Sequence, residues 1–293
     1  MGRGKRDKRG ADRRQVRRRG RRWVLAAVCL ALAAALALWR PWRRTVALPE
    51  ELTATSVLVL DGAGGVLAQR EADLPRSPSS LTKLLSLYLI LEDVENGKLA
   101  LEERVRVPLE AANTTGSKYG LYPGQEVTVE QLLAGSILNS GCDCVLTLAT
   151  LSAGSEAAFV ERMNQAAAEL GLTGSHFVNA TGLDAAEHYM TARDLGVLAR
   201  RLVEDHPLYL DYSSQAALEL DGLRFRNLNR LAGTDPRVLG LKTGTSPIGG
   251  NNLVTYARRG EESCYIVLLD SASETLRFFE TEQLLDLVLG GEA

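Results

Sequence analysis

The amino-acid sequence predicts an α+β domain whose two ends build one antiparallel sheet, with flanking helices and a mostly helical middle subdomain. A hairpin signal stands near the start of this domain, helical apolar spacing dominates its middle, and short strand-like runs closed by a helix form its end. Because a helical stretch separates the two groups of strands, the first and last strands are expected to share one sheet.

The sheet is expected to begin at residues 56–70, SVLVLDGAGGVLAQR. Two short apolar runs flank Asp61, Gly62, Gly64 and Gly65, which supply turn chemistry. After this hairpin the apolar residues follow helical spacing in six segments. These segments are 81–96, 129–138, 142–151, 155–170, 192–204 and 274–289.

Short strand-like runs replace the helical pattern after residue 215. They are AALEL (216–220), LRFRNL (223–228), VLGLK (238–242), NLVTYA (252–257) and CYIVLLD (264–270). The last helix before these runs has a clear start signal. Thr191 with Asp194 resembles a capping box with Asp in place of Glu, and it marks Ala192 as the first helical residue.

Length and composition favour one globular domain with a sizeable core. The chain has 293 residues, of which 45% are hydrophobic, and this excludes disordered, collagen-like and disulfide-scaffold classes. Residues 1–44 hold 15 of the 34 Lys and Arg, which leaves 19 bases against 34 acids in residues 45–293. A domain this acidic would repel a phosphate backbone, so no nucleic-acid partner is expected.

An uncharged run, WVLAAVCLALAAALALW, occupies residues 23–39. It would make about 25 Å of helix, at the short end of what spans a bilayer, and Trp23 and Trp39 stand where indole rings favour the interface. Twelve Lys and Arg precede the run and three follow it, which predicts a cytoplasmic N-terminus. The alternative is a cleaved signal peptide and a secreted protein, although no good small-residue cleavage site follows the run.

The chain is therefore expected to consist of four parts. They are a basic cytoplasmic tail (1–22), a single transmembrane anchor (23–39), a stalk (40–51) and an extracytoplasmic domain (52–293). Cys142, Cys144 and Cys264 are an odd number in this domain, which argues against a disulfide framework. A metal site at Cys142 and Cys144 would need a second Cys or His pair at ligand spacing, and the sequence has none.

Ser80 and Lys83 form an SxxK pair at the start of the predicted helix 81–96. Three residues correspond to about 300° of helical rotation, so the hydroxyl and the amine share a face one turn apart. This geometry suits a serine nucleophile whose proton passes to a lysine that burial or a nearby cation keeps neutral. A solvated helix also offers such pairs, but the apolar run LLSLYLILE after Lys83 disfavours a solvated charge.

Lys242, Thr243, Gly244 and Thr245 form a second candidate motif at the end of the strand-like run 238–242. Residues 45–293 contain 15 Arg but only four Lys, so lysine is the rarer cation here. A strand lysine next to a glycine would bind a carboxylate and leave strand amides free as oxyanion donors. The structural alternative is a surface strand that ends in a turn.

Ser140, Gly141 and Cys142 form a third candidate motif between two predicted helices. A hydroxyl at Ser140 could relay a proton to a leaving amine. The simpler alternative is that Ser140 is the N-cap of the helix that follows.

The motifs SxxK, SxN and KTG, in that chain order, are the signature of serine β-lactamases and penicillin-binding proteins. All three stand here in order, with Cys142 in the last position of the second. The surrounding sequence resembles the low-molecular-mass penicillin-binding proteins that are serine-type D-alanyl-D-alanine carboxypeptidases of the β-lactamase/transpeptidase-like superfamily. The resemblance runs from about residue 52 to about 290, through SPSSLTKLLSLYLILE, LYPGQEVTVEQLLAGSILNSG, FVERMNQAAAELGLTGSHFVNATGLD, HYMTARDLGVLAR and VLGLKTGTSPIGGNNLV.

This resemblance implies a membrane-anchored serine D,D-carboxypeptidase that removes the terminal D-Ala from peptidoglycan stem peptides ending in D-Ala-D-Ala. Ser80 would form the acyl-enzyme, Lys83 would act as its general base, and Ser140 would assist proton transfer. β-Lactam antibiotics would acylate Ser80 as covalent inhibitors, and no metal or organic cofactor is implied. An extracytoplasmic substrate agrees with the bilayer contact and topology predicted from residues 23–39.

The KTGT segment would bind the substrate. The resemblance implies that Lys242, Thr243 and Thr245, around Gly244, hold the terminal carboxylate of the peptide. The backbone amides of Ser80 and Thr245 would form the oxyanion hole.

Cys142 is the main departure from the family pattern. The family usually has Asn there, and a thiol cannot offer an amide's pair of donor and acceptor. This leaves open a weakly active or non-catalytic peptidoglycan-binding homologue. A serine β-lactamase is a further alternative, although no deacylating Glu stands in an E-x-x-L-N context.

The remaining polar residues of the matching stretches are expected to be structural. SxxK chemistry needs no histidine, so His176 and His188 are expected to support the fold. His206 is expected at the surface. Asn164 and Asn179 are expected to hold the fold through hydrogen bonds.

Overall fold

The structure is a computed structural model that describes residues 45–290. The predicted tail (1–22), the anchor (23–39) and the first part of the stalk lie outside the described residues. Between residues 45 and 290 no single helix is long and apolar enough to cross a membrane. One pair of helices, Cys142–Ala153 and Glu156–Glu169, meets the length and composition criteria only jointly, with a bend of 84° between the two.

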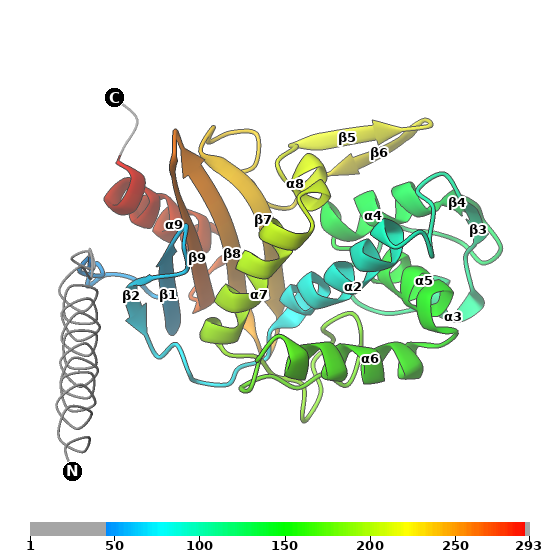
Figure 1. Ribbon diagram of the computed structural model, residues 1–293, viewed down its shortest axis with the longest axis horizontal. Coiled ribbons are helices and arrows are strands. Elements are labelled where there is room, and N and C mark those ends of the chain that lie inside the picture. Colours follow the sequence, from blue (N-terminus) through cyan, green and yellow to red (C-terminus); the bar gives the residue numbers. More distant parts are fainter. Residues whose placement is uncertain (1–44, 291–293) are drawn as a thin grey trace, which may run out of the picture. The chain divides into compact units, whose positions relative to one another are not determined.

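A five-stranded sheet with the order β2-β1-β9-β8-β7 forms the centre of the domain (Figure 1). Its strands are β1 (Ser56–Asp61), β2 (Val66–Arg70), β7 (Val238–Ser246), β8 (Gly250–Arg259) and β9 (Glu262–Ser271). Every neighbouring pair is antiparallel, and Ser56 of β1 stands opposite Leu269 of β9. The two ends of the chain therefore share one sheet, as the sequence predicts.

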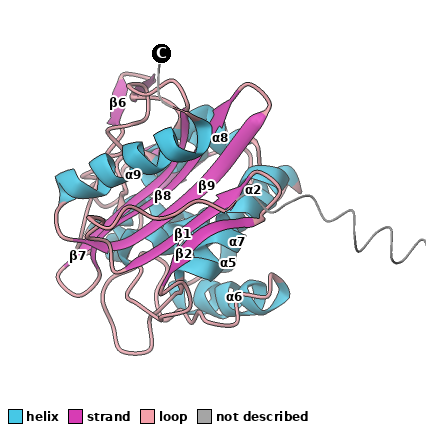
Figure 2. Ribbon diagram, turned by 90° about the vertical axis from the view of Figure 1, so that its left-hand side faces the viewer, coloured by secondary structure: helices cyan, strands magenta, loops and turns pink. Residues whose placement is uncertain are grey.

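Helices cover both faces of this sheet. The helix α9 (Glu274–Leu289) lies across one face, and α7 (Ala192–Asp205) and α8 (Leu208–Ser213) lie behind the other (Figure 2). Val57 and Val59 of β1 face the core under α9, whereas Leu58 and Leu60 face the core under the other helices. This alternation is what a strand with two buried faces requires.

A helical subdomain fills the middle of the chain. It contains α2 (Lys83–Glu95), α4 (Val129–Ile137), α5 (Cys142–Ala153) and α6 (Glu156–Glu169), and a 3-10 turn, η1 (Ser79–Thr82), leads into α2. All six predicted helices are confirmed, with ends that shift by a few residues. Sequence periodicity did not indicate the short elements β3 (Arg104–Arg106), α3 (Leu109–Ala112), β4 (Glu126–Thr128) and α8, which have too few residues to show a period.

Two predicted strands stand apart from the main sheet. The strands β5 (Ala217–Leu220) and β6 (Leu223–Arg226) pair only with each other. Phe225 of β6 is buried and stacks on Tyr119 with ring centroids 4.7 Å apart. Burial of Phe225 turns its strand neighbours to the opposite face of the hairpin.

The start of α7 agrees with the predicted capping signal in part. The Thr191 hydroxyl accepts a hydrogen bond from the Asp194 backbone amide at 3.1 Å, which makes Thr191 the N-cap. The Asp194 carboxylate does not return this bond, because it accepts from the Gly174 amide and the Ser175 hydroxyl instead. Asp194 therefore ties a preceding loop to the helix start.

The described end of the predicted stalk lies against the domain. The Val46 amide donates to the Leu67 carbonyl at 3.0 Å, and the Val46 and Leu48 side chains pack against the core under α9. Residues 45–51 thus form part of the folded unit, which starts at Thr45.

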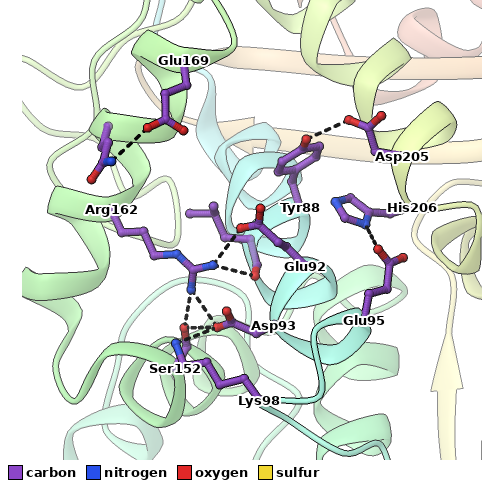
Figure 3. Close-up of polar contacts among 12 residues, drawn as sticks. Tyr88, Glu92, Asp93, Glu95, Lys98, Ser152, Arg162, Glu169, Asp205 and His206 are labelled. Atoms are coloured by element: carbon purple, nitrogen blue, oxygen red, sulfur yellow. Dashed lines mark hydrogen bonds and ion pairs between the residues drawn. The ribbon is translucent and has the colours of Figure 1, made fainter.

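A polar network fixes the C-terminal half of α2 against its neighbours (Figure 3). The buried Asp93 carboxylate accepts from Arg162 at 2.7 Å, from Ser152 at 2.5 Å and from Lys98 at 3.2 Å. Arg162 also bonds the Glu92 carboxylate at 2.9 Å. The network joins α2 to Lys98, α5 and α6. It therefore fixes the position of α2, the helix that directly follows η1.

His206 belongs to the same region, and its predicted place at the surface is wrong. Its Nδ1 lies 2.9 Å from the Glu95 carboxylate, and its ring meets the Tyr88 ring edge-on at 4.5 Å (Figure 3). The residue is buried against Tyr88 and Glu95 of α2, and the next residue, Pro207, is the N-cap of α8.

Candidate active site

Ser80 and Lys83 lie at the junction of η1 and α2. The Lys83 Nζ is 3.0 Å from the Ser80 Oγ, which confirms the predicted shared face, although the turn that joins them is a 3-10 turn. The Lys83 Nζ also donates to the Thr181 carbonyl at 2.6 Å and contacts the Cys142 Sγ at 3.4 Å. The amine is therefore oriented by partners from two other segments of the chain.

Lys83 is fully buried, and no acidic side chain within residues 45–290 forms an ion pair with it. Burial lowers the pKa of Lys83 below its ordinary value, whereas the adjacent Cys142 acts in the opposite direction. The hydrogen bond to the Thr181 carbonyl remains available to a neutral amine. Lys83 is therefore suited to accept the proton of the Ser80 hydroxyl.

The loop that supplies the Thr181 carbonyl approaches η1 very closely. Gly182 has a φ of +82°, and a Cβ on it would lie 1.8 Å from the Ser79 carbonyl oxygen, so only glycine fits. The Asn179 Oδ1 accepts from the amides of Thr181, Gly182 and Leu183 at 2.7–3.2 Å. Asn179 thus holds the loop in place, as predicted for a structural residue.

Ser140 faces the same region from the loop before α5. Its φ is +57°, an uncommon value for a residue with a side chain, and its Oγ is buried with no hydrogen-bond partner among the described atoms. The N-cap of α5 is Gly141, without a side-chain bond, so the alternative role of Ser140 as a helix cap is wrong. An orphaned hydroxyl in a strained loop is a candidate for contact with a substrate.

The KTGT segment lies on β7, the edge strand of the main sheet. Lys242 is buried, and its Nζ donates to the Thr243 carbonyl at 3.1 Å, so the alternative of a surface strand is wrong. Burial lowers the pKa of Lys242 well below its ordinary value, and the charges of Lys83 and Arg277 add to this. A Cβ on Gly244 would lie 3.0 Å from the Pro78 carbonyl, so glycine permits β7 to pack against η1.

Arg277 of α9 is a site residue that the sequence analysis missed. Its Nη1 donates to the Thr245 hydroxyl at 2.7 Å and to the Gly244 carbonyl at 3.0 Å, and its Nε has no partner among the described atoms. Helical spacing could have indicated that Arg277 is buried, because it places Arg277 on the same face of α9 as Thr281 and Leu284, which are also buried. A buried arginine needs bonding partners, and helical spacing does not show which residues these are.

A cavity of about 710 Å³ joins these groups. Ser80, Ser140, Thr243, Thr245 and Arg277 line it, while Lys83 and Lys242 lie buried behind its wall. A nucleophile, an activating amine, a free hydroxyl and several anion-binding groups thus surround one space. This set of groups suits acyl transfer from a substrate with a carboxylate near its reacting bond.

The other histidines and Asn164 take structural places. The His176 Nδ1 lies 2.6 Å from the Glu187 carbonyl, and its backbone pairs with Tyr189. Asn164 donates to the Phe177 carbonyl at 2.8 Å and accepts from the Phe177 amide at 3.0 Å. Between residues 45 and 290 no group of three His, Cys, Asp or Glu side chains could hold a metal, and the three cysteines are free and buried.

His188 contacts the turn η1, which carries Ser80. Its Nε2 lies 2.8 Å from the Thr82 hydroxyl, and its Nδ1 accepts a hydrogen bond from the Val178 amide at 3.1 Å. Burial lowers the pKa of His188 to about 4, and the nearby His176 adds to this effect. The ring is therefore neutral at pH 7.

We predict that His188 makes the fold sensitive to mild acid. Its pKa is lower in the folded chain than in the unfolded chain, so the unfolded chain binds more protons between about pH 6.5 and 4. Stability should fall as pH falls through this window, by about 3 kcal/mol from this group. Urea unfolding of wild type and His188→Asn over that range should show a smaller pH dependence in the variant, and identical slopes would contradict the prediction.

Comparison with known proteins places this site in a family. The family described as D-alanyl-D-alanine carboxypeptidase matches residues 43–273. The chain belongs to this family.

D-alanyl-D-alanine carboxypeptidase DacC of Escherichia coli (strain K12) is 34% identical over 249 residues, which cover 83% of this chain and 62% of DacC. DacF of Bacillus subtilis (strain 168) is 32% identical over 83% of this chain and 64% of its own length. The chain thus spans less than two thirds of these carboxypeptidases.

Solved structures of penicillin-binding proteins share the fold. Penicillin-binding protein 6B from Escherichia coli is 31% identical, with a TM-score of 0.76 over 84% of this chain and 79% of its own. Penicillin-binding protein D2 from Listeria monocytogenes, in its ampicillin-bound form, is 29% identical, with a TM-score of 0.76 over 83% of this chain and 100% of its own. These structures confirm the predicted fold class for the domain.

Proposed function

We propose that the domain is a serine D,D-carboxypeptidase that removes the terminal D-Ala from peptidoglycan stem peptides. The observation that carries the proposal is the 3.0 Å contact between the Ser80 Oγ and the buried Lys83 Nζ at the wall of the cavity. The family supports the same activity. The carboxypeptidase relatives support D-Ala-D-Ala peptides as the substrate class.

Acylation begins when Ser80 transfers its proton to the neutral Lys83 amine and its Oγ attacks the carbonyl carbon of the penultimate D-Ala. The amides of Ser80 and Thr245 stabilise the oxyanion. Ser140 donates a proton to the leaving amine as the carbon–nitrogen bond breaks, and it recovers one through Lys83. Water then cleaves the ester, which releases the shortened peptide and restores the Ser80 hydroxyl.

The terminal carboxylate of the substrate would bind where Thr243, Thr245 and Arg277 line the cavity. The Arg277 Nη1 donates to the Thr245 Oγ1 at 2.7 Å, which leaves the Thr245 hydroxyl hydrogen free to bond the carboxylate, and the guanidinium supplies positive charge. The buried Lys242 lies behind these residues and does not line the cavity itself.

Arg277→Met should lower kcat/KM for a D-Ala-D-Ala peptide by about 30- to 100-fold, because a charge-assisted contact to the carboxylate is lost. The same substitution should have a much smaller effect on a peptide whose terminal carboxylate is amidated. Thermal unfolding of the variant separates this loss from a loss of fold. An equal effect on both peptides would show that Arg277 does not bind the carboxylate.

The direct test is release of D-Ala from an N-acylated tripeptide that ends in D-Ala-D-Ala, measured with the purified full chain in mild detergent. D-Ala release together with a stable penicillin adduct supports the carboxypeptidase. Rapid loss of the penicillin without a lasting adduct would support the β-lactamase alternative. A stable adduct without D-Ala release would support a penicillin-binding homologue that does not turn over peptide.

Cys142 favours the weakly active alternative, because its thiol, 3.4 Å from the Lys83 Nζ, is a weaker hydrogen-bonding group than the amide of an asparagine. Cys142→Asn restores the residue that the family usually has. If the thiol limits the rate, this variant should release D-Ala faster than the wild type. The comparison therefore shows whether the native residue restrains the activity.

We further propose that residues 23–39 anchor the chain in the membrane with the domain outside. The uncharged run and the basic residues before it support this topology. Protease added to intact cells should digest the domain, and the protein should sediment with membranes. A soluble extracellular domain with a new N-terminus would support signal cleavage instead.

A further inference from the structure

The cavity carries more positive charge than a D-Ala carboxylate requires. Residues 45–293 hold 19 bases against 34 acids, yet Arg224, Arg226, Arg230 and Arg277 line this one cavity together with a single acid, Glu274. Several arginines in one cavity produce a positive local potential, although the domain as a whole is negatively charged. Such a field attracts an anionic group.

Two of these arginines form no ion pair with a described residue. Glu274 lies 4.0 Å from Arg230 and 3.9 Å from Arg277. Within residues 45–290 neither Arg224 nor Arg226 takes part in an ion pair. Both are exposed, so their guanidinium groups are open to a ligand from solution.

Arg224 has an acidic neighbour across the hairpin. Glu219 stands opposite it in the β5–β6 register and therefore shares its face, but no ion pair joins the two and Glu219 does not line the cavity. Arg226 stands opposite Ala217, whose small side chain leaves space beside the guanidinium. Arg226 therefore keeps its charge available toward the cavity.

The hairpin brings both arginines into the cavity that Ser140 lines. Phe225 is buried between them, so the alternation of β6 turns Arg224 and Arg226 to the opposite face. The Arg226 amide donates to the Asn139 side chain at 3.3 Å, and the Leu228 amide donates to the Leu138 carbonyl at 3.0 Å. The end of β6 is thus fastened to the loop that carries Ser140.

We propose that Arg224 and Arg226 form an anion subsite for the leaving residue and select leaving residues that carry a second carboxylate. The inference rests on the proposed function, in which Ser140 protonates the leaving amine, so the wall beside Ser140 belongs to the leaving residue. An acidic side chain on that residue can reach the two guanidinium groups, and a basic one is repelled.

The reaction is unchanged by the larger leaving residue. The Ser80 Oγ forms an ester with the acyl carbonyl carbon, and the carbon–nitrogen bond to the leaving residue breaks. The amine takes the proton that Ser140 donates, and water then cleaves the ester. The subsite acts only by binding the second carboxylate, so it alters the choice of substrate and not the chemistry.

The test compares three N-acylated tripeptides that end in D-Ala-D-Ala, D-Ala-D-Glu or D-Ala-D-Lys, with release of the last residue by the purified full chain as the readout. Wild type should have a kcat/KM for the D-Glu peptide at least about tenfold above that for the D-Lys peptide. The double variant Arg224→Glu/Arg226→Glu should lower this ratio by more than about tenfold. Arg104→Glu, a charge reversal on β3 away from the cavity, should leave the ratio unchanged.

Acylation by benzylpenicillin serves as the control for fold and nucleophile, and it should be similar in all three proteins, which are wild type, the double variant and Arg104→Glu. Equal ratios in wild type and the double variant, with release of D-Ala intact, would overturn the subsite and leave the proposed function standing. A wild-type preference for the D-Lys peptide would overturn the subsite as well. Failure to release a residue from any peptide would overturn the proposed function and the subsite together.

Discussion

Replacing Ser80 with alanine should abolish release of D-Ala, with a loss in kcat on the order of 10⁴-fold or more. The substitution removes the oxygen that forms the ester, and among residues 45–290 no other hydroxyl forms a hydrogen bond with the Lys83 amine. The single-turnover rate of peptide cleavage measures the effect without interference from product release.

The Ser80→Ala variant should keep its fold, because the Ser80 hydroxyl has Lys83 as its only side-chain hydrogen-bond partner within the described chain. Thermal unfolding and circular dichroism provide the control. A folded variant that retains more than about 1% of the wild-type rate would show that another group is the nucleophile.

Replacing Lys83 with glutamine should lower the rate of acylation by on the order of 10³-fold, because the serine loses its general base. The pH profile gives a second signature. Burial lowers the pKa of Lys83, so the neutral amine forms at a lower pH than for an exposed lysine. The wild-type rate should therefore rise with pH through an apparent pKa below the ordinary lysine value, and the variant should lack that rise.

Lys98→Gln is the matched control for Lys83→Gln. Lys98 follows α2, is half exposed, and bonds Asp93 at 3.2 Å, away from the cavity. Its replacement should leave both the acylation rate and the pH profile as in wild type. A Lys83→Gln variant that keeps its fold, its rate and the rising limb would exclude Lys83 as the base.

Local sequence patterns predicted the parts of the site that neighbours in the chain create. The three-residue spacing of Ser80 and Lys83 was sufficient to place the hydroxyl and the amine on one face. Alternation and turn chemistry located β1 and the long strands at the end of the chain. The apolar run after Lys83 indicated its burial, which the structure confirms.

Local sequence patterns could not predict the contacts between segments that are distant in the chain. The Thr181 carbonyl and the Cys142 sulfur reach Lys83 from 98 and 59 residues away. Arg277 joins the site only because α9 crosses the sheet above Gly244 and Thr245. Periodicity describes one element at a time, so it cannot state which elements meet.

The predicted surface position of His206 and the helix-cap alternative for Ser140 were both wrong. His206 was expected at the surface, but it packs against Tyr88 and Glu95 of α2. Ser140 resembled a helix cap, but its φ of +57° moves the cap to Gly141 and frees the hydroxyl. The burial of His206 depends on packing against α2, and the place of the cap depends on the φ of Ser140, and residue propensity reveals neither.

The acyl-enzyme is tested most directly by the mass of the intact protein after incubation with benzylpenicillin, followed by peptide mapping of the adduct. A mass increase equal to one molecule of benzylpenicillin, carried by the peptide that contains Ser80, is the predicted result. An unmodified protein with the penicillin still intact in solution would contradict it. An adduct on any other residue would contradict the assignment of Ser80 as the nucleophile.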